Sequence, residues 1–247
     1  MNDDIRLLFD LVYNAHVPKA IHRYFSDTYL FLLYKDPDDL TRLRPIGIPS
    51  AMRRIIGTHV ARYFQKRFAQ TLLPFNFAVG IEGGMDFIIK TMQLSIERYI
   101  QIPQSKKEVP TRAAVFLDFT NMFNTISREA LLDMIRKFYP ELLPLALMLY
   151  NEDGTVHYRW EDGSWRRISM VEGVNQGCPL SAIFAALVLD RALRPVDTKL
   201  RARAAARLAS GDAGDDGHGS VTNLFGYIDD VTSMVPLVDI KFFHKEI

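Results

Sequence analysis

Apolar residues recur along the chain with two different spacings. Helical spacing predicts a helix around Leu7–Val12 and a second from Ser50, a plausible N-cap, to about Ala69. Similar stripes predict four more helices: one after residues 78–86 carrying Ile88, Met92, Ile96 and Tyr99, one over 128–139 capped by Ser127, one over 141–150, and one carrying Ile183, Phe184, Leu187, Val188 and Leu189.

Shorter apolar runs predict strands between these helices. Tyr29–Tyr34 is dense enough in apolar residues for a buried strand, and residues 43–48 can run back beside it after the turn-forming residues 36–39. Ala113–Leu117 is a short apolar strand bounded by polar residues. Two further β-hairpins are expected, over residues 155–169 and 224–235. The pattern thus mixes helices with hairpins.

Composition narrows the possibilities only a little. The chain has 247 residues, is 48% hydrophobic and carries a net charge of +1, so any basic surface must be local. A single cysteine, Cys178, excludes an internal disulfide framework and fits a reducing compartment. The first ten residues lack the features of a secretory signal, and no apolar run approaches the ~18 residues of a membrane span. We expect an intracellular protein without a membrane partner.

Two adjacent carboxylates, Asp229 and Asp230, lie between two β-prone runs within Leu224–Pro236. This arrangement predicts a tight hairpin with both acids at its tip. Neighbouring like charges repel, so a bound cation is one explanation, and Mg²⁺ is the first candidate because it prefers oxygen ligands. The alternative is a solvated turn, since aspartate favours turns for local reasons.

A third carboxylate, Asp118, ends the apolar strand Ala113–Leu117. At the end of a buried strand, it is well placed to reach a metal ion across a neighbouring hairpin. The alternative is an ordinary acidic residue at a strand end. Only the tertiary structure can distinguish the two interpretations.

Basic residues concentrate in two segments. The hairpin around residues 35–49 carries Lys35, Arg42 and Arg44, which suit the phosphates of a nucleotide or a plain charged turn. The helix expected from Ser50 carries five cations and, between the first and the last of them, no acid: Arg53, Arg54, Arg62, Lys66 and Arg67. A solvated basic face would look the same, but this run favours contact with a nucleic-acid backbone.

Two glycine-rich stretches lack the spacing of known binding loops. Residues 78–86 match neither a dinucleotide loop nor a P-loop. Residues 201–220, first rich in Ala and Arg and then in Gly and Asp, lack the alternating acids and closing glutamate of a calcium loop. We expect the second stretch to be a flexible insertion.

Four segments in order, RPIGIP, LDFTNMFNTI, GVNQGCPLS and FGYIDDV, resemble the successive motifs of reverse transcriptases. The likeness is strongest to those of non-LTR retrotransposons and of group II introns and retrons, and it extends from about Tyr29 to the last residues. It implies an α+β right-hand polymerase with fingers and palm, whose antiparallel palm sheet packs on helices. The implied division is fingers over 1–110, the first catalytic palm strand over 111–126, an insertion with helices and a β-hairpin over 127–172, and palm over 173–247, ending before a thumb.

The resemblance also implies RNA-directed DNA synthesis from deoxynucleoside triphosphates, with an RNA template and a DNA or RNA primer. Two Mg²⁺ ions, or Mn²⁺ in their place, would be held by Asp118 and Asp229 as principal ligands. Asp230 would be an adjacent ligand, and the backbone carbonyl of Phe119 a further one. The three aspartates would thus be the catalytic residues.

Nucleotide-binding residues follow from the same motifs. Phe123 takes the family's steric-gate position, where a ring excludes a 2′-hydroxyl. Gln176 and Gly177 would contact the incoming nucleotide and template base, and Lys35 and Arg44 its phosphates. Tyr227 would lie against the primer terminus. The chain departs from many relatives at Asn124, where they have aspartate, at Asn175, where they have proline, and at Met122, where they have a small residue.

Two alternatives to an active reverse transcriptase stay open. The chain could be a decayed retroelement remnant that binds nucleic acid without catalysis, which its early end after Asp230 favours. It could instead copy RNA into RNA, which the ring at Phe123 disfavours because viral RNA polymerases place a carboxylate there. Origin in a eukaryotic retroelement would imply a nuclear location.

Overall fold

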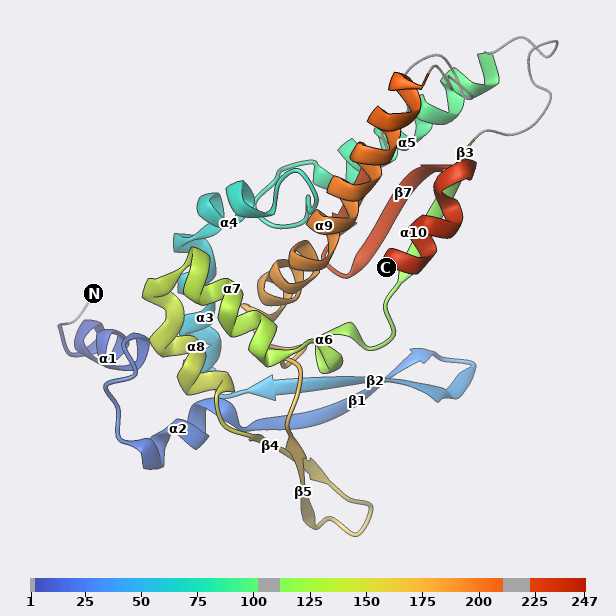
Figure 1. Cartoon of the computed structure of the whole chain (residues 1–247). Helices are drawn as coiled ribbons and strands as arrows, with labels where there is room; N and C mark the ends of the chain where they lie inside the picture. The colour runs from blue at the N-terminus through green and yellow to red at the C-terminus, as the bar shows by residue number, and fades with distance from the viewer. Residues whose placement is uncertain (1–2, 102–111, 211–222) are drawn as a thin grey trace. The chain divides into compact units, whose positions relative to one another are not determined.

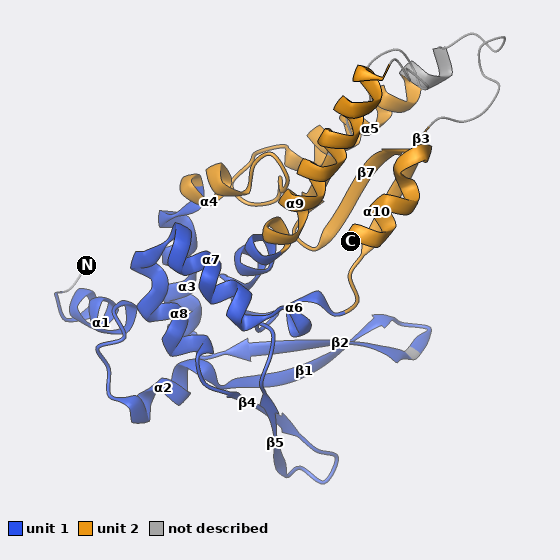
Figure 2. Cartoon of the chain, viewed as in Figure 1, with its two compact units in different colours: residues 1–65, 121–188 blue, residues 66–120, 189–247 orange. Residues whose placement is uncertain are grey.

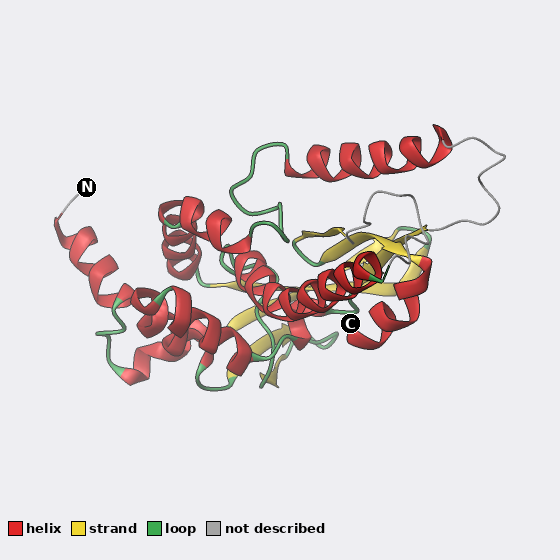
Figure 3. Ribbon diagram, turned by 45° about the horizontal axis from the view of Figure 1, so that its top comes forward, coloured by secondary structure: helices red, strands yellow, loops and turns green. Residues whose placement is uncertain are grey.

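The computed structural model describes residues 3–101, 112–210 and 223–247 (Figure 1). The chain forms two compact units, each assembled from two separate stretches (Figure 2). Unit 1 comprises residues 1–65 and 121–188, and unit 2 comprises residues 66–120 and 189–247. Helices and strands both contribute, as an α+β fold requires (Figure 3). The fingers and palm boundaries implied by the motifs differ from these units and stay a prediction.

Unit 1 contains a four-stranded sheet in the order β2-β1-β4-β5. Strands β1 (Thr28–Asp36) and β2 (Asp39–Pro49) form a long antiparallel hairpin. Strand β4 (Gly154–Arg159) pairs in parallel with the start of β1 and antiparallel with β5 (Trp165–Met170). The helical elements are α1 (Asp3–Tyr13), α2 (Lys19–Ser26), α3 (Ala51–Tyr63), α6 (Met122–Thr125), α7 (Arg128–Phe138), the 3₁₀ helix η2 (Pro140–Leu142) and α8 (Leu143–Tyr150).

Strand β1 is exposed, so the prediction of a buried strand at Tyr29–Tyr34 was wrong. Phe31, Leu33 and Tyr34 are 52%, 55% and 60% exposed. Strand β4 pairs with β1 only at Thr28 and Tyr29, so the rest of β1 has β2 as its one strand neighbour in the described sheet. An apolar run indicates a strand, but it cannot tell whether another layer covers it.

Both predicted helix caps are confirmed. The Ser50 side chain accepts a hydrogen bond from the Arg53 N–H at the start of α3, and the Ser127 side chain accepts one from Ala130 at the start of α7. The helix expected to run from Ser50 to about Ala69 is divided, because α3 ends at Tyr63 and α4 (Gln65–Leu72) follows. Its apolar pattern continues across that break, which is why periodicity did not reveal it.

Unit 2 is built on a three-stranded antiparallel sheet in the order β3-β7-β6. Its strands are β3 (Arg112–Asp118), β6 (Asn223–Tyr227) and β7 (Asp230–Pro236). Its helical elements are most of α4, α5 (Gly84–Gln101), α9 (Ser181–Ala209) from Leu189 onward, the 3₁₀ helix η3 (Leu237–Asp239) and α10 (Ile240–Glu246). One face of the sheet packs Phe225 and Met234 against Phe77, Ile88 and Met92.

Helix α9 continues to Ala209, so the flexible insertion expected over 201–220 was wrong for residues 201–209. Two arginines in this part, Arg203 and Arg207, bind the buried Asp239 through contacts of 2.8 Å each. These ion pairs, together with the helix propensity of alanine and arginine, account for the continued helix. Residues 211–222 lie outside the described part of the chain. No helix among the described residues is long and apolar enough to cross a membrane.

Candidate functional site

The strand register of unit 2 brings Asp118 and Asp230 together. Asp118 is the last residue of β3, Asp230 is the first of β7, and the two are direct partners in the antiparallel pair. Residues directly opposite each other in such a pair lie about 4.5–5.5 Å apart at Cα, with side chains on the same face. Two acids 112 positions apart along the sequence are thus neighbours at the same end of the sheet.

Asp229 lies in the turn next to this pair. Tyr227 pairs with Asp230, so the turn consists of Ile228 and Asp229 alone. The tight hairpin is confirmed, but only Asp229 occupies its tip. The expectation that Asp230 also lies at the tip was wrong, because Asp230 opens the second strand, where Asp118 is its partner.

The environment of Asp230 disfavours its charged form. Partial burial, followed by the charges of Asp229 and Asp118, raises the pKa of Asp230 above its usual value. A divalent cation would relieve this repulsion, and carboxylate and carbonyl oxygens are the ligands that Mg²⁺ prefers. Within residues 3–101, 112–210 and 223–247, no three or more His, Cys, Asp or Glu side chains are grouped so that they could hold a metal ion. The oxygen donors therefore fit Mg²⁺, while the strand register makes only Asp118 and Asp230 direct neighbours.

Tyr227 shares the sheet edge with the carboxylates. It is the direct partner of Asp230 and packs beside the apolar cluster that includes Phe225 and Met234. Sheet geometry places Asp118, Asp230 and Tyr227 on the same face. A role for Tyr227 at the primer terminus stays a prediction.

Three of the sequence motifs meet in unit 1 through their backbones. The Val174 N–H donates to the Phe123 carbonyl at 2.6 Å, and the Gly177 N–H donates to the Gly47 carbonyl at 3.2 Å. A Cβ at Gly177 would lie 2.5 Å from that same Gly47 oxygen, so this approach requires glycine. The motif residues Phe123, Gln176 and Gly177 are therefore held on one framework within unit 1.

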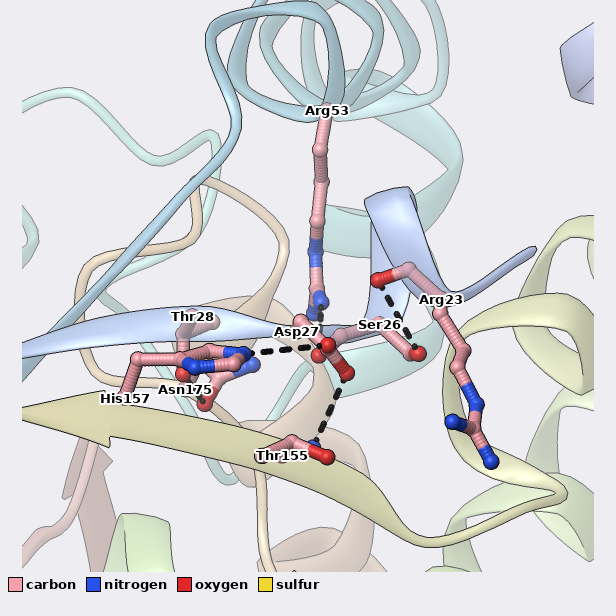
Figure 4. Close-up of polar contacts among 8 residues, drawn as sticks. All are labelled: Arg23, Ser26, Asp27, Thr28, Arg53, Thr155, His157 and Asn175. Atoms are coloured by element: carbon pink, nitrogen blue, oxygen red, sulfur yellow. Dashed lines mark hydrogen bonds and ion pairs between the residues drawn. The ribbon is translucent and has the colours of Figure 1, made fainter. Parts of the chain in front are cut away.

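Asn175, where many relatives have proline, belongs to this framework. Its side chain is 3% exposed, and its Oδ1 accepts a hydrogen bond from the Thr28 hydroxyl at 3.4 Å (Figure 4). Thr28 lies at the start of β1, close to where Asp27 binds the Thr155 N–H at 3.0 Å and the His157 ring at 3.2 Å. These contacts connect residues 173–177, the GVNQG loop, to the open end of the β1–β2 hairpin, where Thr28 pairs with Pro49.

The predicted phosphate-binding residues lie on that hairpin. Lys35 occupies the irregular position where the register of the β1–β2 pair shifts, and Arg44 pairs with Leu33 across it. Both side chains are exposed. Their positions are compatible with phosphate binding, which stays a prediction.

The five basic residues predicted to bind nucleic acid divide between the two units. Arg54 and Arg62 lie along α3 and line a cavity of about 710 Å³ in unit 1, together with His59 and Gln176. Lys66 and Arg67 are exposed but belong to unit 2. The break between α3 and α4 at Phe64, which helical periodicity did not show, lies between these two pairs along the sequence.

Arg53 is a correction, because its side chain is only 2% exposed. Its guanidinium extends from α3 toward Ser26 at the end of α2 (Figure 4). Its Nη1 donates to the carbonyl of the preceding residue, Phe25, at 2.7 Å. Nη2 donates to the Tyr150 hydroxyl at 2.8 Å. Arg53 therefore supports the fold of unit 1 and is not available to a phosphate backbone.

Sequence reasoning missed two buried residues that hold motif segments in place. Arg128 is 8% exposed, and its Nε donates to the Gly173 carbonyl at 3.0 Å, which fixes the start of the GVNQG loop. Asn76 is 1% exposed, and its Nδ2 donates to the Ile228 carbonyl at 3.2 Å, next to Asp229. No local pattern marks either residue, since both act on segments far away in the sequence.

A family model described as "Reverse transcriptase (RNA-dependent DNA polymerase)" matches residues 34–238. No curated protein matches the chain. Similar solved structures include apo telomerase from Candida tropicalis truncated from its C-terminal domain, with 13% identity, a TM-score of 0.56, and coverage of 90% of this chain and 45% of that one. Telomerase from Candida albicans in complex with a fragment of telomeric RNA shows 11% identity, a TM-score of 0.58, and coverage of 93% and 41%.

The chain thus spans less than half the length of these telomerases. At this level of identity the likeness shows the fold, which is the α+β fingers-and-palm fold of polymerases.

Proposed function

The chain belongs to the reverse transcriptase (RNA-dependent DNA polymerase) family, and from that premise we propose that it adds deoxynucleotides to a primer 3′-hydroxyl on an RNA template. The observation that carries the proposal is the direct pairing of Asp118 with Asp230, with Asp229 in the adjoining turn. Asp118 and Asp230 are far apart in sequence but lie at the same end of one sheet. Phosphoryl transfer requires such a concentration of negative oxygen ligands.

In this proposal Asp118 and Asp229 are the principal ligands of two Mg²⁺ ions, for which Mn²⁺ can substitute. Asp230 and the Phe119 carbonyl supply the remaining protein oxygens. When bound, the ions activate the primer hydroxyl and neutralise charge on the triphosphate. The pairing of Asp118 with Asp230 exists before any substrate arrives. Partial burial, followed by the charges of Asp229 and Asp118, raises the pKa of Asp230.

Residues of unit 1 would select and hold the nucleotide. Phe123 would pack against the sugar and exclude a 2′-hydroxyl, and Gln176 and Gly177 would contact the base pair being formed. The backbone bond from Val174 to Phe123 supports this assignment, because it holds the ring's segment against the GVNQG loop. Lys35 and Arg44 would bind the triphosphate.

The nucleic acid would be held by exposed basic residues and by Tyr227. Arg54 and Arg62 beside the unit 1 cavity, with Lys66 and Arg67 on α4, would contact phosphates, and Tyr227 would contact the primer end. An RNA template is proposed by analogy, since one of the similar telomerases was solved with telomeric RNA. Descent from a retroelement of the non-LTR or group II type remains part of this proposal.

The second candidate is a nucleic-acid-binding module without catalysis. It is favoured by the absence of a metal-holding group of three acidic, His or Cys side chains in the described part of the chain. Synthesis of RNA from ribonucleotides is a third and weaker possibility, which Phe123 disfavours.

The test is primer extension on an RNA template with Mg²⁺ and the four deoxynucleotides. The natural chain is compared with Asp229→Asn and with Asp162→Asn, a matched control in the exposed turn of the β4–β5 hairpin. Extension by the natural chain and the control, with none by Asp229→Asn, supports the proposal. Salt-sensitive RNA binding by all three without extension would establish the binding module instead. Faster incorporation of ribonucleotides would refute the role of Phe123.

A further inference from the structure

The turn that carries Asp229 has an unfavourable backbone conformation. Ile228, its first residue, has a φ of 60°, in the left-handed region. β-Branched residues rarely adopt this region, and they remain there only where surrounding contacts hold them. Because Ile228 directly precedes Asp229, the contacts that hold Ile228 also determine the direction in which the chain enters Asp229.

A buried side chain of the same unit makes such a contact. Asn76 lies between α4 and α5, is 1% exposed, and donates from Nδ2 to the Ile228 carbonyl at 3.2 Å. Its Oδ1 accepts a hydrogen bond from the Ala78 N–H at 3.1 Å. With Oδ1 facing a donor and Nδ2 facing an acceptor, the amide has one favourable orientation.

The backbone around Asn76 is joined to the hairpin as well. Asn76 forms a parallel bridge with Gly226, and the Phe77 N–H donates to the Gly226 carbonyl at 2.9 Å. The Gly226 N–H donates to the Phe75 carbonyl. A Cβ on Gly226 would lie 3.0 Å from Asn76 Nδ2 and 3.0 Å from the Phe75 oxygen. The segment therefore extends the sheet at β6, and the close approach depends on glycine.

The segment that carries Asn76 is in turn anchored on α9. Arg194 forms an ion pair with Asp190 at 2.6 Å, and its Nη2 donates to the Leu73 carbonyl at 3.3 Å. Its guanidinium carbon lies 5.1 Å from the centre of the Phe75 ring. A continuous series of contacts within unit 2 therefore runs from α9 to the turn.

We propose that Asn76 is a positioning residue that holds the Ile228–Asp229 turn in the conformation from which Asp229 binds metal. This inference rests on the proposed function, because it takes Asp229 to be a ligand. Asn76 contacts neither metal nor substrate in this role and acts through the Ile228 carbonyl. It lies outside the four motifs on which the family resemblance depends.

Asn76→Asp tests the contact, because it keeps the size of the side chain and the acceptor for Ala78 but removes the donor to Ile228. In the full chain, hydrogen exchange of the turn amides is expected to become about tenfold faster, the usual consequence of losing a buried hydrogen bond. The matched control is Asn14→Asp, since Asn14 makes an exposed bond to the Asp10 carbonyl at 2.8 Å. The control should leave exchange in the turn unchanged.

Kinetics supply an independent measurement. Asn76→Asp should lower kcat about tenfold and raise the Mg²⁺ concentration needed for half-maximal extension, while KM for the deoxynucleotide stays constant. A merely structural residue would not produce this separation. In a chain with Ile228→Gly the effect should shrink, because glycine adopts a positive φ without support.

The possible outcomes separate the two proposals. If the natural chain does not extend a primer, the proposed function fails, and exchange in the turn still decides whether Asn76 holds it. If Asn76→Asp exchanges and extends like the natural chain, the inference is overturned. Slower extension with unchanged exchange in the turn would also overturn it. Should Asn76→Asp not fold, Gly226→Ala displaces the same Nδ2, and unchanged exchange in that variant would count against the inference.

Discussion

Arg53 and Arg54 are neighbours in sequence and are indistinguishable by composition, yet the structure assigns them opposite roles. Arg53 is buried in unit 1, whereas Arg54 is exposed and lines the 710 Å³ cavity beside α3. We predict that Arg53→Ala lowers the free energy of unfolding strongly. Arg54→Ala should leave it unchanged within about 0.5 kcal/mol, as for other exposed positions.

The size of the Arg53 effect follows from its contacts. Truncation leaves the Phe25 carbonyl and the Tyr150 hydroxyl without donors that now lie at 2.7 and 2.8 Å. Each unsatisfied buried group costs about 1–3 kcal/mol. Loss of the cation–π contact with Tyr150, at 5.3 Å, adds to this, while release of a buried charge offsets part of it. The net loss is about 2–4 kcal/mol, a large share of a typical domain stability of about 5–15 kcal/mol.

Urea unfolding followed by circular dichroism measures the stability of both variants. Binding to RNA at several salt concentrations measures their affinity for a phosphate backbone. Arg54→Ala should weaken RNA binding and lower the slope against log salt by about 1, as for one lost phosphate contact. The reasoning would be refuted if Arg53→Ala changed stability by less than about 0.5 kcal/mol, the range of ordinary surface substitutions. It would also be refuted if Arg53→Ala weakened RNA binding while remaining fully stable.

Three further predictions follow from the site. Gly173→Ala should destabilise unit 1 by more than about 2 kcal/mol in urea unfolding, because φ is 72° and a Cβ would lie 2.4 Å from the Asn124 backbone; Gly83→Ala, with φ of 68° but open space, should cost less. Partial burial, followed by the charges of Asp229 and Asp118, raises the pKa of Asp230, so the stabilisation that this group contributes when protonated should be lost as pH rises from 3.8 through its folded pKa. In metal-free urea titrations Asp230→Asn should remove this loss relative to the natural chain, and an unchanged pH profile would contradict the assignment. Phe123→Ala should reduce the preference for deoxynucleotides over ribonucleotides at least about tenfold in single-nucleotide incorporation, and an unaltered ratio would remove Phe123 as the gate.

Local chemistry made part of this fold predictable. Ser50 and Ser127 cap the helices that they were expected to cap, because a cap depends on the few residues that follow it. The hairpin at Asp229 was predicted from two β-prone runs separated by turn-forming residues. The order of four motifs was enough to indicate the family, which the family model confirms over residues 34–238.

Other features depended on partners far away in the sequence. The apolar run of β1 predicted a strand correctly but not its exposure, because pairing with β4 is limited to two residues. The alanine- and arginine-rich end of α9 was expected to be flexible, yet Arg203 and Arg207 in this part form ion pairs with Asp239, which follows more than 30 residues later in the sequence. Periodicity reports which side chains are apolar, and it does not report what covers them.

By itself the sequence determined which functional groups are present and in which order the motifs that carry them follow. These groups are two acids at a hairpin, a third at a strand end, an aromatic ring and basic residues. The tertiary structure alone decided that Asp118 faces Asp230, that Asn76 supports the turn beside Asp229, and that Arg53 is enclosed while Arg54 is exposed. The physical reason is the separation along the sequence over which each kind of interaction acts. Propensities, caps and turns arise from interactions within a few residues, whereas register and burial arise from contacts between segments that only the folded chain brings together.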